Sequence, residues 1–204
     1  MKLTRRHLRD LLIGGTWLVL ILGAMGLFTR YTEQAGEPAT APATWPEGTR
    51  IRPTPGQSTL LVLAHPMCPC TRATLADLAR LLVRVPGKVA THVLFIRPVG
   101  ASIDWEKSDL WDRARAIPGV EVVADPDGTE ANRFGAATSG EALLYGPDGR
   151  LEFAGGITSS RGHEGDNPGA DRIVSLVTTG SAELATAPVF GCPLNTPAAG
   201  EKAP

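Results

Sequence analysis

Cysteines, aromatic residues and surplus positive charge are all scarce in this chain. Its 204 residues include three cysteines, 5% aromatic residues and a formal net charge of −1. Three cysteines are too few for a small scaffold stapled by disulfides, which carries a larger, even number. Without a basic surplus to neutralise phosphates, the chain is not expected to bind nucleic acid. Two of the three cysteines almost touch in sequence, which indicates chemistry rather than cross-linking.

An apolar run near the N-terminus predicts a transmembrane helix. Residues 11–28 carry no charge, and at about 1.5 Å per residue they span about 27 Å, close to the thickness of a bilayer core. A cleaved signal peptide is the alternative, although its apolar region is usually shorter. Basic residues precede the run, so the positive-inside rule predicts a single pass through a bacterial inner membrane, with a cytoplasmic N-terminus and a periplasmic C-terminal domain. These basic residues are Lys2, Arg5, Arg6 and Arg9.

Composition divides the chain into five segments. Residues 1–10 are expected in the cytoplasm and residues 11–28 in the membrane. Residues 29–50 are rich in Ala, Thr, Pro, Gly and Glu without apolar periodicity, which predicts a flexible linker. Residues 51–182 form the predicted folded domain, and residues 183–204 form an irregular tail that contains Cys192.

Strand and helix patterns alternate within the folded segment. Short apolar runs predict strands and apolar residues at helical spacing predict helices. Such alternation is typical of an α/β domain with a sheet flanked by helices, and a terminal hairpin would make the sheet mixed. Strands are expected at 59–64, 89–96, 120–124, 141–145 and 151–154, and helices at 71–84, 104–117, 128–134 and 170–178.

The segment His65-Pro66-Met67-Cys68-Pro69-Cys70 lies between the first predicted strand and its helix. Reactive groups in α/β proteins usually lie at this carboxyl end of a strand. The helix N-terminus and nearby Arg72 would favour a thiolate, which is the attacking species in disulfide exchange. We therefore predict a dithiol redox centre at Cys68 and Cys70.

These stretches resemble the thioredoxin-like superfamily. LVLAHPMCPCTRATLADLARL is similar to the family's strand, Cys-x-x-Cys motif and amphipathic helix, and FGAATSGEALLYGPDGRLEFAGGI is similar to its closing hairpin. The combination of HPMCPCTRA, SRGHEGDN and FGCPL also resembles the RedB-type bacterial redox proteins. The resemblance implies a thioredoxin-like mixed β-sheet flanked by helices and a redox-active disulfide.

Two positions depart from the family pattern. The dithiol spacing is one residue short, so either cysteine could attack first; we expect Cys68, on the turn, to be the more exposed and the nucleophile. The family's cis-proline falls on Gly140, preceded by Ser139. A glycine there would change substrate handling and could leave room for a metal.

Three further residues are candidates for the site. His65 could stabilise a thiolate or bind metal, or could simply end a strand facing solvent. His163, in the polar loop of residues 155–167, could face the dithiol as an acid, base or ligand. Asp166 or Asn167 in the same loop would cap the last helix. Cys192 could be a resolving thiol, a metal ligand or half of a structural disulfide.

The leading functional hypothesis is a membrane-anchored periplasmic thiol–disulfide oxidoreductase without a cofactor. Its partners would be exported proteins with thiols or disulfides and a membrane or periplasmic electron donor, because no GxGxxG fingerprint for a flavin or nicotinamide follows a strand. The alternative is a Sco-like copper-binding or copper-delivery protein that uses Cys68, Cys70 and His163, since thiolates and imidazole suit Cu(I). A peroxiredoxin is disfavoured because its Pro-x-x-x-Thr/Ser-x-x-Cys arrangement is missing.

Overall fold

The computed structural model describes residues 5–180 and 185–194, which form two units. One ends at Gln34 and the second begins at Ala35. The helices are α1 (Arg5–Thr32), α2 (Pro69–Arg84), α3 (Asp109–Arg115), α4 (Thr129–Arg133) and α5 (Pro168–Thr179). The strands are β1 (Ser58–Ala64), β2 (Val89–Arg97), β3 (Val120–Pro126), β4 (Glu141–Tyr145), β5 (Leu151–Gly156) and β6 (Ala185–Ala187).

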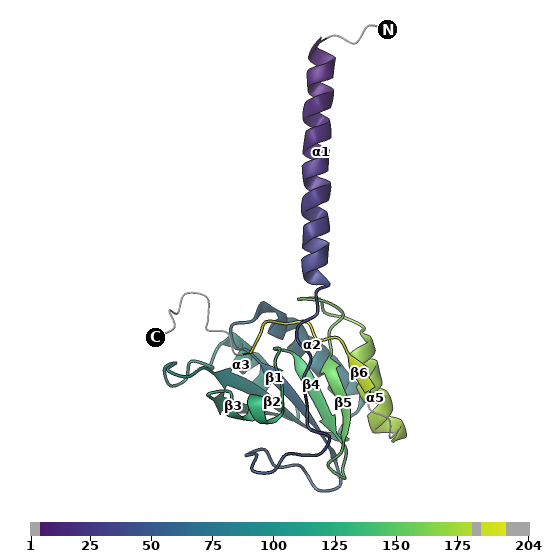
Figure 1. Ribbon diagram of the computed structural model, residues 1–204. Coiled ribbons are helices and arrows are strands. Elements are labelled where there is room, and N and C mark those ends of the chain that lie inside the picture. Colours follow the sequence, from purple (N-terminus) through teal and green to yellow (C-terminus); the bar gives the residue numbers. More distant parts are fainter. Residues whose placement is uncertain (1–4, 181–184, 195–204) are drawn as a thin grey trace. The chain divides into compact units, whose positions relative to one another are not determined.

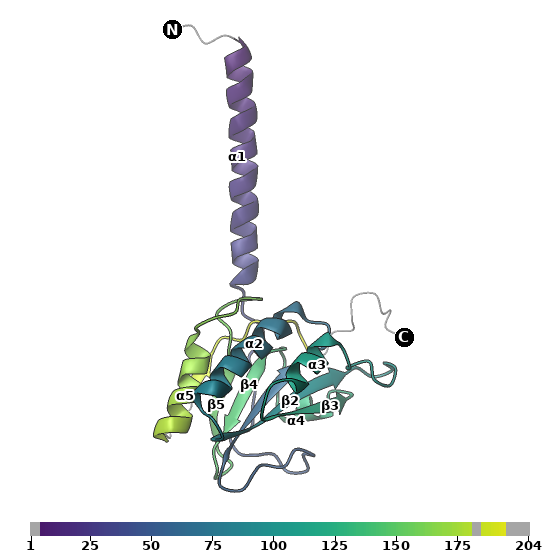
Figure 2. The same ribbon diagram turned by 180° about the vertical axis from the view of Figure 1, so that it is seen from behind.

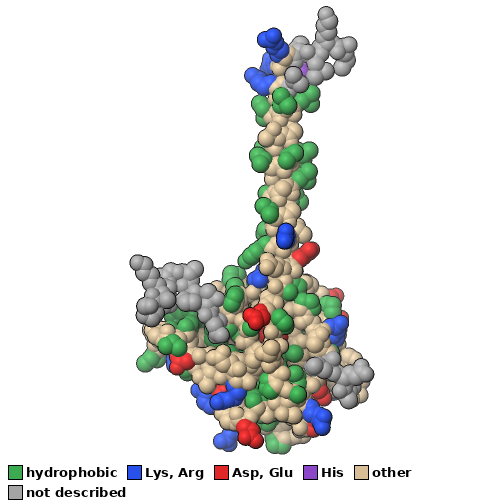
Figure 3. Space-filling model, viewed as in Figure 1, with side chains coloured by type: hydrophobic (Ala, Val, Ile, Leu, Met, Phe, Trp, Pro, Cys, Tyr) green, Lys and Arg blue, Asp and Glu red, His purple; other side chains and the backbone are tan. Residues whose placement is uncertain are grey.

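The first unit is the single helix α1, which covers the predicted membrane segment. Its large apolar side chains, such as Trp17 and Phe28, are exposed, and basic side chains gather at its N-terminal end (Figure 3). By length and composition α1 could cross a membrane, and a signal sequence near an N-terminus would have the same properties. The direction of the predicted crossing therefore stays a prediction.

The second unit is built on one six-stranded sheet in the order β3-β2-β1-β4-β5-β6 (Figure 1). Strands β1, β2 and β3 are parallel, whereas β4 pairs antiparallel with both β1 and β5. The predicted mixed sheet and its terminal hairpin are thus confirmed. The short strand β6 runs parallel to β5 in a part of the chain where an irregular tail was expected.

Both faces of the sheet are buried, because alternate residues of the central strands point to two separate cores. Leu60 and Val62 of β1 face helices α2, α3 and α5, which cover one side (Figure 2). Leu61 and Leu63 face the other side, where Phe134 at the end of α4 packs. This two-sided burial explains why β1 reads as a continuous apolar run.

Two segments differ from the sequence prediction. The segment expected to be a flexible linker packs on the domain: Trp45 makes edge contacts with Phe134 and Tyr145 at centroid distances of 5.2 and 5.1 Å. The helix expected over residues 104–117 begins only at Asp109. Asp104 has a φ of 70°, in the left-handed region, which a continuous helix cannot include.

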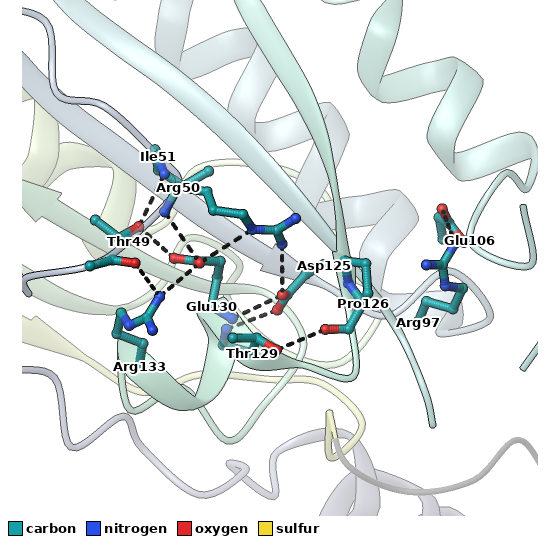
Figure 4. Close-up of polar contacts among 12 residues, drawn as sticks. Thr49, Arg50, Ile51, Arg97, Glu106, Asp125, Pro126, Thr129, Glu130 and Arg133 are labelled. Atoms are coloured by element: carbon teal, nitrogen blue, oxygen red, sulfur yellow. Dashed lines mark hydrogen bonds and ion pairs between the residues drawn. The ribbon is translucent and has the colours of Figure 1, made fainter. Parts of the chain in front are cut away.

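A buried polar cluster fixes the end of β3 and the start of α4 (Figure 4). The carboxylate of Asp125 accepts hydrogen bonds from the N–H groups of Glu130 and Ala131, both at 2.9 Å. Arg50 lies 3.6 Å from Asp125 and 3.5 Å from Glu130, so it balances two carboxylates that are fully buried. Burial raises the pKa of Asp125, and these contacts offset part of that cost.

Candidate functional site: three converging thiols

The Cys-Pro-Cys turn lies at the carboxyl end of β1, as the sequence predicts. Helix α2 begins at Pro69, with Cys68 as its N-cap residue. Proline suits this first helical position because its missing N–H would have no partner there. The backbone N–H of Thr71 donates to the Cys68 carbonyl at 3.0 Å, which closes the first turn. The sulfur of Cys68 therefore belongs to a residue at the positive end of a 16-residue helix.

Cys192 comes from the far end of the chain and meets Cys68. The two Sγ atoms lie 3.0 Å apart, and all three cysteines are free thiols. Because a disulfide bond is about 2.05 Å long, the pair is in close contact without being bonded. We call residues 188–194, which carry Cys192, the C-terminal strap.

The strap buries the dithiol. Cys68 is 1% exposed and Cys70 is 8% exposed, whereas Cys192 is only partly buried. The expectation that Cys68 is the more exposed of the two turn cysteines is therefore wrong. The reason is the strap, which the sequence pattern gave no cause to place over the turn.

Hydrogen bonding among the thiols separates their acidities. The pKa of Cys68 falls to about 4, first because the Cys70 thiol hydrogen-bonds to it and then because Cys192 does so, and these bonds outweigh its burial. The same hydrogen bond and burial raise the pKa of Cys70. Burial, followed by the contact with Cys68, raises the pKa of Cys192 to about 11. Cys68 is thus the most acidic of the three thiols.

The residues at the missing cis-proline support both the turn and the strap. The Oγ of Ser139 accepts from the N–H of His65 at 2.9 Å and lies 3.0 Å from Thr71 Oγ1. The N–H of Ser139 donates to the Cys192 carbonyl at 2.8 Å. Next to it, Gly140 has a φ of 92°, and a Cβ there would lie 2.9 Å from Thr74 Oγ1 and 3.7 Å from the Phe190 carbonyl. A side chain at residue 140 would therefore press on Thr74 of α2, while the strap lies at ordinary contact distance.

His65 shapes the turn. Its side chain is buried, its Nδ1 accepts from the N–H of Met67 at 3.1 Å, and its ring meets Trp105 edge-on at 5.6 Å. The alternative of a solvent-facing strand end is therefore wrong.

Two other candidates lie away from the sulfurs. Arg72 pairs with Asp109 of α3 at 2.5 Å. His163 is exposed, while Asn167 in its loop caps α5 by accepting from the Ala170 N–H at 2.7 Å.

Arg161 is the residue of the polar loop that reaches the site. Its Nη1 donates to the Gly191 carbonyl at 2.6 Å, and its charge lowers the pKa of both Cys70 and Cys192 in part. The sequence pattern did not single out Arg161, and its position in the loop beside His163 was the only signal available. Within the described residues, no group of three or more His, Cys, Asp and Glu side chains is arranged to hold a metal ion. The copper set of Cys68, Cys70 and His163 is therefore not assembled.

Known structures resemble this fold at low sequence identity. An uncharacterized conserved protein from Geobacillus kaustophilus has a TM-score of 0.57 and 15% identity, covering 81% of this chain and 94% of that chain. A hypothetical protein from Sinorhizobium meliloti 1021 has a TM-score of 0.56 and 18% identity, covering 81% and 96%. A weaker similarity, with a TM-score of 0.43 and 16% identity over 61% and 83%, extends to a secreted Mycobacterium tuberculosis disulfide oxidoreductase homologous to E. coli DsbE. No protein-family model and no curated protein matches the chain.

The second unit has the mixed sheet flanked by helices that the resemblance to the thioredoxin-like superfamily implies, with parallel strands β1–β3 and an antiparallel hairpin of β4 and β5. The narrower resemblance to RedB-type proteins stays a prediction.

Proposed function

We propose that this chain is a membrane-anchored thiol–disulfide oxidoreductase acting on exported proteins, with Cys68 as its reactive sulfur. The observation that carries the proposal is the 3.0 Å contact between the Sγ atoms of Cys68, in the Cys-Pro-Cys turn, and Cys192. Hydrogen bonding with Cys70 and Cys192 lowers the pKa of Cys68 to about 4. A thiol of that acidity is a thiolate at neutral pH and a good leaving group from a disulfide. The position at the N-terminus of α2 supports the same reading.

The stabilised thiolate also favours one direction of electron flow. A disulfide that releases a stable thiolate on reduction is an oxidising one, because the reduced form of the protein is lowered in free energy. The protein would accept electrons from thiols of exported proteins and pass them to a membrane or periplasmic partner. The apolar helix α1 and the basic residues before it support anchoring in a bacterial inner membrane with this domain in the periplasm.

A second thiol must pair with Cys68 in each cycle, and the chain offers two. Sequence reasoning predicts Cys70, its neighbour across Pro69. The structure adds Cys192, whose Sγ lies 3.0 Å from that of Cys68. The auxiliary roles proposed for Ser139 and Gly140 are to hold the turn and to avoid a clash with Thr74 of α2, and His65 positions the turn through Met67.

Disulfide transfer to a peptide tests the proposal. Full-length protein in detergent is oxidised, freed of oxidant and mixed with a peptide that contains two thiols. We expect one peptide disulfide to form for each protein disulfide lost, measured by mass spectrometry, and no transfer by Cys68→Ser. Ser159→Ala, an exposed residue of the polar loop, is the control and should behave like the wild type.

Two results would contradict the proposed function. One is full transfer activity in Cys68→Ser. The other is stoichiometric copper in the purified protein together with no exchange of thiols, which would return the copper-delivery alternative.

A further inference from the structure

We propose that the working disulfide of this protein joins Cys68 to Cys192, and that Cys192 is the sulfur on which partner thiols form their mixed disulfide. This inference rests on the proposed function and names the second thiol of that site. In this arrangement the strap is a relay between a buried sulfur and an outside partner. It is supported by the backbone pairing of the strap, by its close approach at Gly191 and by the exposure of the two sulfurs.

Backbone pairing sets the position of Cys192. The strap runs antiparallel to residues 137–139: the N–H of Ser139 donates to the Cys192 carbonyl, and the N–H of Leu194 donates to the Ala137 carbonyl, both at 2.8 Å. Thr138 and Pro193 form the bridge between these two bonds. Because the Cys192 carbonyl itself makes one of these bonds and the other lies two residues further along, at Leu194, Cys192 is held in register with residues 137–139.

A close approach at Gly191 brings the strap down onto the site. A Cβ at this residue would lie 1.8 Å from the Ser139 carbonyl oxygen, so only glycine fits. Arg161 donates to the Gly191 carbonyl, and the N–H of Gly36 donates to the Val189 carbonyl at 2.8 Å. The side chains of Val189 and Leu194 are buried, which anchors both ends of the strap.

Exposure decides which sulfur a partner can reach. Cys68 is buried beneath the strap, whereas Cys192 remains partly accessible. Disulfide exchange also proceeds fastest when the leaving sulfur is the more acidic one. In a Cys68–Cys192 disulfide these two factors agree, since the accessible sulfur is attacked and the acidic sulfur leaves.

Two thiol–disulfide exchanges oxidise a dithiol partner. A partner thiolate attacks Cys192 Sγ, the Cys68–Cys192 bond breaks, and Cys68 leaves as a thiolate held by the Cys70 thiol. The partner's second thiolate then attacks its own sulfur in the mixed disulfide and releases Cys192, which takes up one proton. The partner loses two electrons and becomes a disulfide, and Cys68 and Cys192 gain them. A low-molecular-weight disulfide such as oxidised glutathione restores the Cys68–Cys192 bond by the reverse exchange.

Cys70 has a different part in this scheme. A Cys68–Cys70 bridge would have to close across Pro69 alone, at the first turn of α2. The interaction with Cys68, together with burial, raises the pKa of Cys70, which disfavours the Cys70 thiolate that this exchange would need. Cys70 therefore acts as a positioning residue that keeps Cys68 acidic.

Peptide mapping of the oxidised full-length protein separates the two pairings. The reduced protein is treated with oxidised glutathione, quenched in acid, alkylated and digested with trypsin. Cys68 and Cys70 share the peptide of residues 51–72, whereas Cys192 lies in the peptide of residues 173–202. We expect these two peptides to be covalently joined. A disulfide inside the first peptide, or glutathione adducts without an internal disulfide, would overturn the inference.

Matched variants repeat the test without reference to turnover. Cys70→Ser should still give the joined peptides, and Cys192→Ser should not. If Cys192→Ser instead formed the Cys68–Cys70 bridge as readily as wild type forms its own disulfide, the relay would be wrong.

Mixed disulfides locate the sulfur that partners reach. Oxidised wild type and its Cys70→Ser variant are mixed with an excess of a single-thiol peptide, and the adduct should lie on Cys192; an adduct on Cys68 would overturn the relay. Joined peptides in a protein that fails to oxidise the dithiol peptide would refute the proposed function alone and leave the pairing standing.

Discussion

The Cys-Pro-Cys turn and the strap meet at their sulfur atoms, yet they are anchored by different means. The turn joins β1 to α2, and fully buried residues such as Leu63 and Leu78 fix both of these elements in the two cores. The strap is held mainly by a few backbone hydrogen bonds and by the side chains of Val189 and Leu194. Segments with few buried contacts open at lower free energy than core elements. Cys68, the acidic sulfur, therefore lies on the rigid turn, and Cys192, the accessible one, lies on the strap, which opens at lower free energy.

Unseating the strap should have the largest effect. In Gly191→Ala the new Cβ meets the Ser139 carbonyl, so the strap must shift away from the turn. Loss of two backbone bonds at about 1 kcal/mol each would raise the open population more than roughly tenfold. Alkylation of reduced Cys68, followed by mass spectrometry, should accelerate accordingly. Pro188→Ala, at an exposed residue of the same strap, is the control, and equal rates in the two variants would contradict the comparison.

Removing either hydrogen-bonding thiol should make Cys68 less acidic. Cys70→Ala should raise the pKa of Cys68 from about 4 by more than Cys192→Ala does, because the Cys70 hydrogen bond is the larger cause. Each tenfold change in acidity corresponds to about 1.4 kcal/mol. The ultraviolet absorbance of the thiolate, followed against pH, measures this. Cys70→Ser keeps a hydrogen-bond donor, so its Cys68 pKa should lie between the values in wild type and in Cys70→Ala. If Cys192→Ala raised the pKa of Cys68 more than Cys70→Ala does, Cys192 in the strap would be the larger cause of the low pKa.

The core below both segments contains a pH-sensitive carboxyl group. Burial raises the pKa of Glu141, at the start of β4, to about 8, and the nearby backbone of Ala39 offsets only part of this. Because its pKa in the unfolded chain is near 4.5, the folded state keeps a proton that the unfolded state loses as pH rises. Stability should therefore fall between about pH 4.5 and pH 8, with a slope approaching 1.4 kcal/mol per pH unit.

Denaturant unfolding at several pH values tests this expectation. Glu141→Gln should flatten the dependence in that interval, whereas Glu47→Gln, at an exposed residue, should not. An unchanged slope in Glu141→Gln would place the pH sensitivity elsewhere.

The smallest effect on the alkylation rate of Cys68 is expected at Ser139, which contacts both the turn and the strap. Ser139→Ala removes the acceptor for the His65 N–H and leaves a buried donor without its partner, at a cost of about 1–3 kcal/mol. The Ser139 N–H, which pairs with the strap, is untouched by this change. Unfolding midpoints should fall while the alkylation rate of Cys68 rises less than in Gly191→Ala. A larger rise would mean that the turn, and not the strap, controls access.

Local patterns predicted most of the fold and half of the site. The apolar runs of β1 and β2 and the hairpin signal Pro147-Asp148-Gly149 depend on neighbouring residues, and the structure confirms them. The turn cysteines follow from their place between a strand and a helix. The contact of Cys68 with Cys192 joins residues 124 apart, and no periodicity reports such a distance.

Other contacts were not predicted, because the composition of a short segment does not show which distant residues it packs against. The segment before β1 is polar and rich in proline, yet Trp45 packs edge-on against both Phe134 and Tyr145. In the polar loop, His163 was predicted to face the site because an imidazole can act as an acid, base or ligand. In the structure the longer side chain of Arg161 reaches the strap instead. The glycine directly before Cys192 was the signal available in the sequence, since a backbone that approaches another chain segment closely often requires glycine.

The hydrogen bond from Gly36 to Val189 has a practical consequence for protein production. The second unit begins at Ala35, only a few residues after α1 ends at Thr32. A soluble fragment that starts at residue 37 or later would lack Gly36, one of the strap's own anchors, together with the apolar helix. Such a fragment would exaggerate the reactivity of Cys68, so kinetic work on a truncated protein should begin no later than Ala35.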